Sequence, residues 1–478
     1  MATTIGLEAN QSHFSILSLP QEILSSILDL VTNAEGYPGD DFKDRLERTV
    51  RLSETCKQFR DTLTPKLYSE LHLVPNVVDE HNQVVLMDLN DRGRTSTSLL
   101  HTTLKNNPQL GTHCKTLEVW FDQTKALCVP LKEFILSEAT FDFISLLGNT
   151  TYLSIDGFQP TPCDTHSDSV FKFVCTALKR LPKLKTLRLL GRDVSLPFIV
   201  DVMCYITRYS TNLSVLEFGK IGTKGSSSCL QALKELEGTG PITSLTMDEF
   251  SHTPEALDAI VRWPRNLEKL SIFPSVVFDS YYVTQPLFTR WDFATVQPIL
   301  EAQMDSLREL GILALYRDLD RMVGDIENLD LTGFAKLKVL TLPSFQTGYD
   351  TRHIPRILAP NLRIFNWLGP FYNSTEQWVI PEEWVMPEDG VSPDEWGIPA
   401  DWVYSDKRIE NFGQKQEDWV RAMVDFASKR QRALREIYIA FKDQERGRGE
   451  GQPGLVYPCG RLEKVVRYSD ELGIKIRY

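Results

Sequence analysis

The stretch that decides the fold is Leu184-Lys185-Thr186-Leu187-Arg188-Leu189, a phrase of the form Leu-x-x-Leu-x-Φ, in which Φ is apolar. The phrase recurs along the chain, and each copy has the length and apolar spacing of a short β-strand. Clear copies contain Leu117, Leu216, Leu270, Leu310, Leu340 and Phe365 at the second anchor position, and weaker copies are expected at Leu153, Leu245, Ile437 and Val465. The repetition predicts an architecture built from repeated units.

The spacing between copies is nearly regular. The second anchors Leu187, Leu216, Leu245 and Leu270 are separated by 29, 29 and 25 residues, and Leu310 and Leu340 by 30. These intervals lie at or just beyond the upper end of the range for leucine-rich repeats. The strict Asn/Cys ladder position of regular repeats is missing, so the sequence leaves the exact register open.

Helical apolar stripes fill the intervals between the copies. They span residues 170–181, 198–206 and 257–263, the last of them beginning after Thr253-Pro254. The expected fold is therefore α/β: an irregular strand–helix solenoid of about nine to eleven units, with a parallel sheet on its concave face, because one unit cannot cover its own apolar face. A doubly wound α/β enzyme also alternates strands and helices, but it does not require the recurring phrase.

Residues 16–73 carry a different pattern. Ile23, Leu24, Ile27, Leu28 and Val31 form one broad helical stripe that follows Pro20, and the sequence NAEGYPGDD then breaks the helix. A second stripe runs from Phe42 to Leu63. On pattern alone, this helical unit is equally well interpreted as an N-terminal cap on the solenoid core.

The residue types in this unit resemble an F-box. The resemblance is carried by Leu19-Pro20-x-Glu22-Ile23-Leu24-x-x-Ile27-Leu28, Leu52-x-x-x-Cys56-x-x-Phe59-Arg60 and Pro65-x-Leu67-Tyr68. It implies a three-helix hook that docks on a Skp-type adaptor and, through it, on a cullin, and degenerate leucine-rich repeats often follow such a hook. The chain between Val31 and Leu52 is longer and more charged than a compact F-box needs. The sequence therefore does not decide whether the middle helix forms. The implied adaptor-binding residues are Leu19, Pro20, Ile23, Leu24, Ile27, Leu28, Leu52, Cys56 and Phe59.

Two function classes follow from these patterns. In the first, the protein is the substrate-recognition subunit of an SCF-type ubiquitin ligase; its repeats hold an unidentified protein target and it performs no bond chemistry itself. In the second, the protein is a repeat-based scaffold or binding protein outside any ubiquitin ligase.

Length and composition agree with one small domain and one large repetitive region. We expect a disordered N-terminus over residues 1–15, the F-box-like unit over 16–73 and repeats over 74–478. A net charge of −12 and an isoelectric point near 5.3 argue against a nucleic-acid partner. No apolar run is long enough for a membrane span, and no secretory signal is recognisable. The eight scattered cysteines are therefore expected to be reduced, in the cytoplasm and/or the nucleus.

The repeat period has its longest interruption between Phe365 and Ile437. Residues 372–406 contain a duplicated Trp-x-x-Pro phrase, and Glu376 to Asp406 includes nine acidic residues without a Lys or Arg. Its tryptophans are either anchors folded onto the repeats or contacts for a basic target segment. The four candidate target-binding residues are Trp378, Trp384, Trp396 and Trp402.

Motifs for catalysis or cofactor binding are weak. Gly219-x-x-Gly222-x-x-Gly225 lacks the Lys-Ser/Thr pair of a phosphate loop, and Cys163-x-x-His166 is half of a zinc site. His113-Cys114 has no identifiable acid partner for nucleophilic catalysis. We therefore expect no cofactor, no metal and no catalytic residue.

Overall fold

The structure of the protein is a computed structural model. The chain divides into two compact units, the first formed by Met1–Asp156 and Thr176–Leu184, the second by Gly157–Cys175 and Lys185–Tyr478. The structure describes residues 16–32, 42–74, 77–78, 84–85, 95–121, 135–136, 138–158, 165–191, 194–222, 227–274, 291–313, 326–368, 412–430, 433–440 and 459–478.

The first unit begins with a helical hook, formed by η1 (Ile16–Ser18), α1 (Gln21–Thr32), α2 (Phe42–Thr55) and α3 (Lys57–Leu67). Pro20 directly precedes α1, and its carbonyl accepts the N–H of Leu24 at 3.0 Å. Only Cys56 separates α2 from α3; its backbone is extended, and its Sγ accepts the N–H of Phe59 at 3.4 Å. This cap begins α3 and lets the chain turn from α2 into α3 within a single residue. The middle helix α2 forms despite its charged sequence.

A small apolar core holds the hook together. Leu24 and Leu28 from α1 are buried against Leu63 from α3, and Leu52 and Phe59 pack against them partly buried. Each buried leucine contributes about 1.5–3 kcal/mol relative to full exposure. Leu24 and Leu28 lie four residues apart, so α1 turns a single edge toward this core.

A parallel sheet follows the hook within the first unit. β1 (Glu70–Val74), β5 (Thr116–Trp120) and β7 (Tyr152–Asp156) pair side by side, and β4 (Thr95–Ser96) pairs with the other edge of β1. The intervening helices are α4 (Thr97–Asn106), α5 (Pro108–Gly111) and α6 (Glu138–Ser145). A separate antiparallel sheet has the order β3-β2-β6, from Val84–Val85, Val77–Val78 and Ile135–Leu136.

The second unit is a longer parallel ladder in which each strand pairs with the next one along the chain. Its strands are β8 (Thr186–Leu190), β9 (Val215–Phe218), β10 (Ser244–Phe250), β11 (Lys269–Pro274), β12 (Glu309–Ile312), β13 (Val339–Pro343), β14 (Ile364–Leu368), β15 (Glu436–Ala440) and β16 (Lys475–Arg477). Its helices are α8 (Leu196–Tyr209), α9 (Ser227–Glu235), α10 (Pro254–Arg262), α11 (Phe293–Glu301), α12 (Ile354–Ile357), α13 (Gln414–Arg430) and α14 (Cys459–Glu471); α7 (Thr165–Arg180) is shared between the two units.

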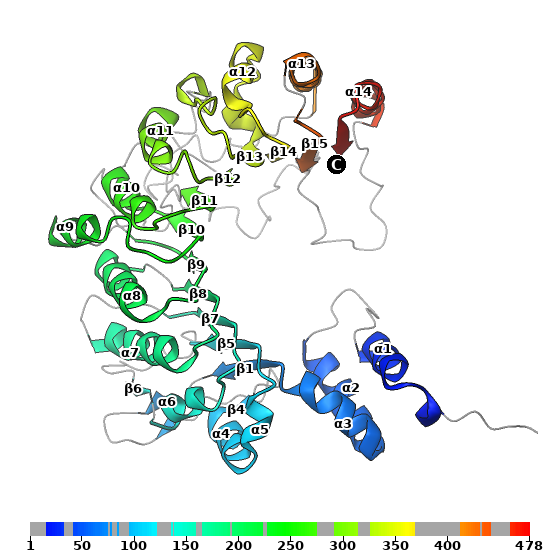
Figure 1. Ribbon diagram of the computed structural model, residues 1–478, viewed down its shortest axis with the longest axis vertical. Helices are drawn as coiled ribbons and strands as arrows, with labels where there is room; N and C mark the ends of the chain where they lie inside the picture. Colours follow the sequence, from blue (N-terminus) through cyan, green and yellow to red (C-terminus); the bar gives the residue numbers. More distant parts are fainter. Residues whose placement is uncertain are drawn as a thin grey trace, which may run out of the picture. The chain divides into compact units, whose positions relative to one another are not determined.

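Short 3-10 turns complete the second unit: η4 (Ile326–Asn328), η5 (Ser344–Thr347) and η6 (Thr351–His353). Within this unit, the strands β8 to β15 line one side and the helices line the other (Figure 1). The helices expected over 198–206 and 257–263 correspond to α8 and α10. Thr253 caps α10 by accepting the N–H of Ala256, and Pro254 occupies its first turn.

One buried apolar position runs through the ladder at the second anchor of the Leu-x-x-Leu-x-Φ phrase. The residues paired there from strand to strand are Leu187, Leu216, Leu245, Leu270, Leu310, Leu340, Phe365, Ile437 and Ile476. All of them are buried. This register confirms the strands predicted from the phrase, with one correction: Val465 lies in α14, and the last strand instead places Ile476 in the ladder. The apolar stripe around Val465 is helical.

The strand order excludes the doubly wound alternative. In a doubly wound sheet the order reverses at a switch point, and helices cover both faces. In the second unit the order follows the chain from β8 to β16 without reversal. The strand–helix solenoid expected from the sequence is therefore confirmed.

A buried glutamine links consecutive repeats in the second unit. Gln303 follows α11 and is only 7% exposed. Its Oε1 accepts the N–H of Leu267 (3.2 Å) and the hydroxyl of Ser306 (2.9 Å), while its Nε2 donates to the carbonyls of Val261 (3.0 Å) and Pro264 (3.1 Å). One side chain thus satisfies polar groups at the end of α10, in the turn that follows α10 and in its own turn.

Candidate functional site

The helical hook presents an apolar face to solvent. Ile23 is 49% exposed and Leu30 is 73% exposed, although both are large aliphatic residues. They lie seven residues apart on α1, so they occupy the same face two turns from each other. Ile16, Leu17 and Val31 are also exposed by more than 40%. The partly exposed Ile27 lies between Ile23 and Leu30 on this face. A run of exposed apolar side chains along one helix face is typical of a protein-docking site.

The residues predicted to contact an adaptor divide between this face and the hook's own core. Pro20 and Ile23 are exposed and Leu19 and Ile27 are partly exposed, whereas Leu24 and Leu28 are buried against Leu63; Leu52 and Phe59 pack on that core, and Cys56 caps α3. Sequence reasoning missed Ile16, Leu17 and Leu30. The recurrence of Ile23, Ile27 and Leu30 at i, i+4 and i+7 was the available signal for a second apolar face.

The open face of the second unit has a row of small residues at its centre, most of them polar. Neighbouring strands align Thr246, Ser271, Gly311, Thr341 and Asn366 at one register position. Asn366 donates from Nδ2 to the hydroxyl of Thr341 at 3.0 Å. The next residue in this row is Tyr438, which is 40% exposed. This strip offers hydroxyl and amide groups beside one aromatic ring, a combination suited to contacts with a polypeptide.

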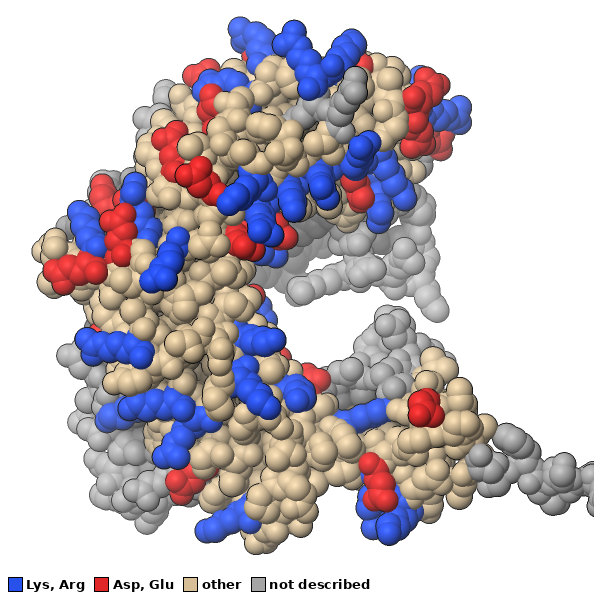
Figure 2. All heavy atoms as spheres, in the orientation of Figure 1, with Lys and Arg blue, Asp and Glu red and all other residues tan. Residues whose placement is uncertain are grey.

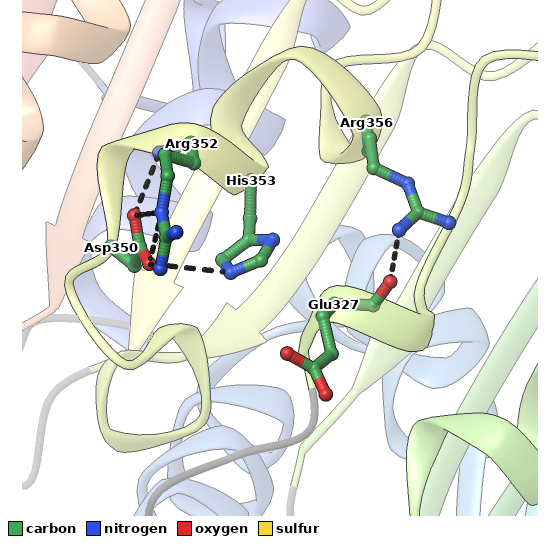
Figure 3. A network of polar contacts seen from close by, with 5 residues as sticks. All are labelled: Glu327, Asp350, Arg352, His353 and Arg356. Atoms are coloured by element: carbon green, nitrogen blue, oxygen red, sulfur yellow. Dashed lines mark hydrogen bonds and ion pairs between the residues drawn. The ribbon is translucent and has the colours of Figure 1, made fainter.

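Two sets of polar contacts hold the short segments on either side of β13 (Figure 3). The Asp350 carboxylate accepts hydrogen bonds from the backbone N–H and the guanidinium of Arg352, and lies 3.5 Å from Nε2 of His353. The hydrogen bond from the Arg352 side chain is the main cause that lowers the pKa of Asp350 to about 2. Arg356 donates to the carbonyl of Glu327 and thereby ties α12 to η4. These contacts position the loops, and their groups are not arranged for catalysis.

An aromatic cluster connects the two sides of the interruption between β14 and α13. Trp367 and Trp419 are buried and stacked, with ring centroids 4.9 Å apart and planes 20° apart. Tyr349 and Phe412 contact Trp367 edge-on, and Phe365 contacts Trp419. The chain before and after residues 369–411 is thus fixed to one core. The candidate target-binding residues Trp378, Trp384, Trp396 and Trp402 all lie outside the described residues.

The described residues contain no cluster of three or more His, Cys, Asp and Glu side chains that could hold a metal ion. Of the weak motifs, Cys163 and Gly225 lie outside the described residues, whereas Gly219 and Gly222 lie in the turn after β9. Among the helices that the structure describes, none is both long and apolar enough to cross a bilayer.

Cys114 is a buried structural thiol. Its Sγ accepts the hydroxyl of Thr150 and donates to the carbonyl of Thr116, each at 3.4 Å. Burial raises the pKa of Cys114 to about 11. The thiolate is the reactive form, so the neighbouring His113 does not make this cysteine a nucleophile.

We expect Cys114 to resist alkylation in the native protein. With a pKa of about 11, roughly one thiol in a thousand is ionised at pH 8. Iodoacetamide treatment followed by peptide mass spectrometry should leave Cys114 unlabelled, whereas the less buried Cys229 on α9 becomes labelled. Unfolding in urea should make Cys114 reactive; equal native labelling of the two cysteines at pH 8 would contradict this assignment.

Comparison with known proteins yields structural similarity only. No protein-family model matches the chain, and no curated protein matches it. An internalin from Listeria monocytogenes is 11% identical with a TM-score of 0.25, over 62% of this chain and 87% of that chain. A crystal structure of the yeast Rad7 and Elc1 complex contains a chain that is 14% identical with a TM-score of 0.28, over 73% of this chain and 88% of that chain. At these scores the fold assignment rests on the strand order and register described above.

Proposed function

We propose that this protein is a non-catalytic, protein-binding subunit of an SCF-type ubiquitin ligase. In this proposal the helical hook holds a Skp-type adaptor and thereby a cullin, and the solenoid holds a protein target. The subunit acts by raising the concentration of the target near the transferred ubiquitin. Its place of action would be the cytoplasm and/or the nucleus.

The observation that carries the proposal is that α1 has both buried and exposed apolar residues. Leu24 and Leu28 supply the hook's internal core, so Ile23 and Leu30 are not needed to hold the three helices together. Large aliphatic side chains on a solvent-facing helix have a cost in solubility that a docked partner would remove. This face also begins at Leu19 and Pro20, the residues that open the F-box-like motif.

The solenoid supports the second half of the proposal. Stacked strand–helix repeats present a long face on which a partner is contacted by several repeats at once. In the second unit this face carries the row from Thr246 to Asn366 and the exposed ring of Tyr438. The proposal also retains residues 372–406 as a candidate part of the target site, with their four tryptophans as contacts.

The test replaces Ile23 and Leu30 together by Asp in the full-length chain. Truncating an apolar anchor at the centre of an interface typically costs about 2 kcal/mol or more, and a carboxylate in its place must also be desolvated. We expect capture of a purified Skp-type adaptor to be lost, while circular dichroism and the melting curve stay close to wild type because both sites already face water.

The matched control is Leu472→Asp, which exchanges an exposed leucine of the second unit for the same carboxylate. It should capture the adaptor as the wild type does. If wild-type protein fails to bind the adaptor, or the double variant binds it equally well, the ligase role is wrong. A repeat-based binding protein outside any ubiquitin ligase would then be the better description.

A further inference from the structure

The second unit has a basic hollow at the leading ends of four neighbouring strands. Its volume is about 420 Å³. The lining contains Asn361, Ala335, Ala433 and five basic residues: Arg308, Lys336, Lys338, Arg363 and Arg435. All five basic residues are exposed, and none of the lining residues is acidic. We call this feature the basic hollow.

The solenoid register produces the hollow. Arg308, Lys338, Arg363 and Arg435 each occupy the position directly before β12, β13, β14 and β15. Their backbones form a ladder, because Lys338 donates to the carbonyl of Arg308 (2.8 Å), Arg363 to that of Lys338 (2.8 Å) and Arg435 to that of Arg363 (2.9 Å). With neighbouring strands about 4.8 Å apart, the four side chains start along a row of about 15 Å.

The leucine phrase explains why these side chains face outward. The residue before each of them is the first anchor of the phrase, and Leu307, Leu337, Leu362 and Leu434 are all buried. Because successive side chains alternate in extended backbone, the following residue points to solvent. Figure 2 shows Lys and Arg side chains gathered over this part of the unit, where β12 to β15 lie in Figure 1.

Little of this positive charge is neutralised within the described part of the chain. Arg308 lies 3.5 Å from the carboxylate of Glu268. No described carboxylate comes within 4.0 Å of the charged nitrogens of Lys336, Lys338, Arg363 or Arg435. Like charges in such a row repel one another, and an anionic ligand would relieve that repulsion. This local positive charge contrasts with the net charge of the whole chain, which is −12.

We propose that the basic hollow binds an acidic segment of a target protein that carries phosphorylated Ser or Thr residues. The inference deepens the proposed function, since it takes the solenoid as the target-binding part. Arg side chains recognise phosphate oxygens through paired hydrogen bonds. Three of the four side chains in the row are arginines, and two of these, Arg363 and Arg435, come from adjacent strands. Asn361 holds the wall of the hollow by donating to the carbonyl of Ala335 at 2.7 Å.

Charge density favours phosphate esters over carboxylates. An extended segment places side chains on one face about 6.6 Å apart, so roughly three of them reach a 15 Å row. Three carboxylates supply a charge of −3, whereas two phosphorylated residues alone supply about −3 to −4. A nucleic acid is a poorer match, because a protein of strongly negative net charge repels a long polyanion outside one short basic row.

The experiment measures fluorescence anisotropy of labelled 12-residue peptides with the full-length protein. The main probe carries two phosphoserines separated by one residue, within a Gly/Ser sequence. Comparison probes are the same peptide without phosphate, the peptide with Asp at both positions, and a single-stranded DNA 12-mer. We expect the phosphopeptide to bind at least tenfold more tightly than each of the others, and its affinity to fall as salt is raised.

Two double variants locate the site. Replacing Arg363 and Arg435 by Ala should weaken phosphopeptide binding about ten- to hundredfold, because charge-assisted hydrogen bonds are lost. Replacing both by Lys keeps the charge but removes the paired donors, so it should still weaken binding severalfold. The control replaces the exposed Lys415 and Lys464 of α13 and α14 by Ala, which removes the same charge and should leave binding unchanged.

Each other outcome overturns the proposal. Equal binding of the Asp peptide would assign the hollow to carboxylates, and tighter binding of the DNA would assign it to nucleic acid. Equal loss in the control variant would show a general charge effect without a site. None of these measurements needs an adaptor, so failure of this inference and failure of the ligase proposal can be distinguished.

Discussion

Replacing Trp367 by Ala is expected to destabilise the second unit by about 3–5 kcal/mol, as large-to-small changes of buried aromatic residues do. Trp367 is fully buried on β14 and stacks on Trp419 of α13 at 4.9 Å. Its removal leaves a cavity between the sheet and the helix, and it also removes an aromatic pair that contributes about 0.5–1.5 kcal/mol beyond burial. We expect the loss of stability to be largest in α13 and β15, the elements that follow residues 369–411.

Hydrogen exchange is a suitable readout, because it reports local stability in a chain with two units. Amide protection in α13 and β15 should fall strongly in Trp367→Ala, while β1 and β5 of the first unit should keep theirs. The control is Trp120→Ala, since Trp120 is 36% exposed at the end of β5. If both variants lose equally little protection in α13, the anchoring role of Trp367 is refuted.

Replacing Gln303 by Leu is expected to cost about 3 kcal/mol or more in the free energy of unfolding of the second unit. The new side chain has a similar size but no polar atoms, so it leaves the carbonyls of Val261 and Pro264 and the N–H of Leu267 without this partner. Each buried polar group left unsatisfied costs about 1–3 kcal/mol. Urea denaturation of the full-length chain should show an earlier transition.

Gln297→Leu is the matched control for this change. Gln297 of α11 also bridges backbone, since it donates to the carbonyl of Asp330 and accepts its N–H, but it is only partly buried. Water can replace its hydrogen bonds, so we expect a loss of about 1 kcal/mol or less. A similar loss of unfolding free energy in the two variants would mean that the burial of Gln303 does not determine the size of the loss.

The sequence was sufficient for the repeating architecture, because that information is local and recurs. The second anchors from Leu187 to Ile437 lie in one register, as the phrase predicted, and α8 and α10 form where the apolar stripes predicted helices. Prediction went wrong at Val465, because an apolar residue in a short stripe is compatible with a strand or a helix until its neighbours are placed.

Only the tertiary structure decided which side chains of each sequence pattern are buried and which are exposed to a partner. The apolar positions on α1 look equivalent in sequence, yet packing against Leu63 buries Leu24 and leaves Ile23 in solvent. Trp367 and Trp419 lie on opposite sides of a 43-residue stretch outside the described residues, and only folding stacks their rings. Arg308 and Arg435 are 127 residues apart in the chain, but their strands lie within one ladder, so the basic row exists only once the repeats have stacked. Side-chain periodicity is a property of one segment, whereas burial, stacking and charge density depend on segments that are distant in sequence.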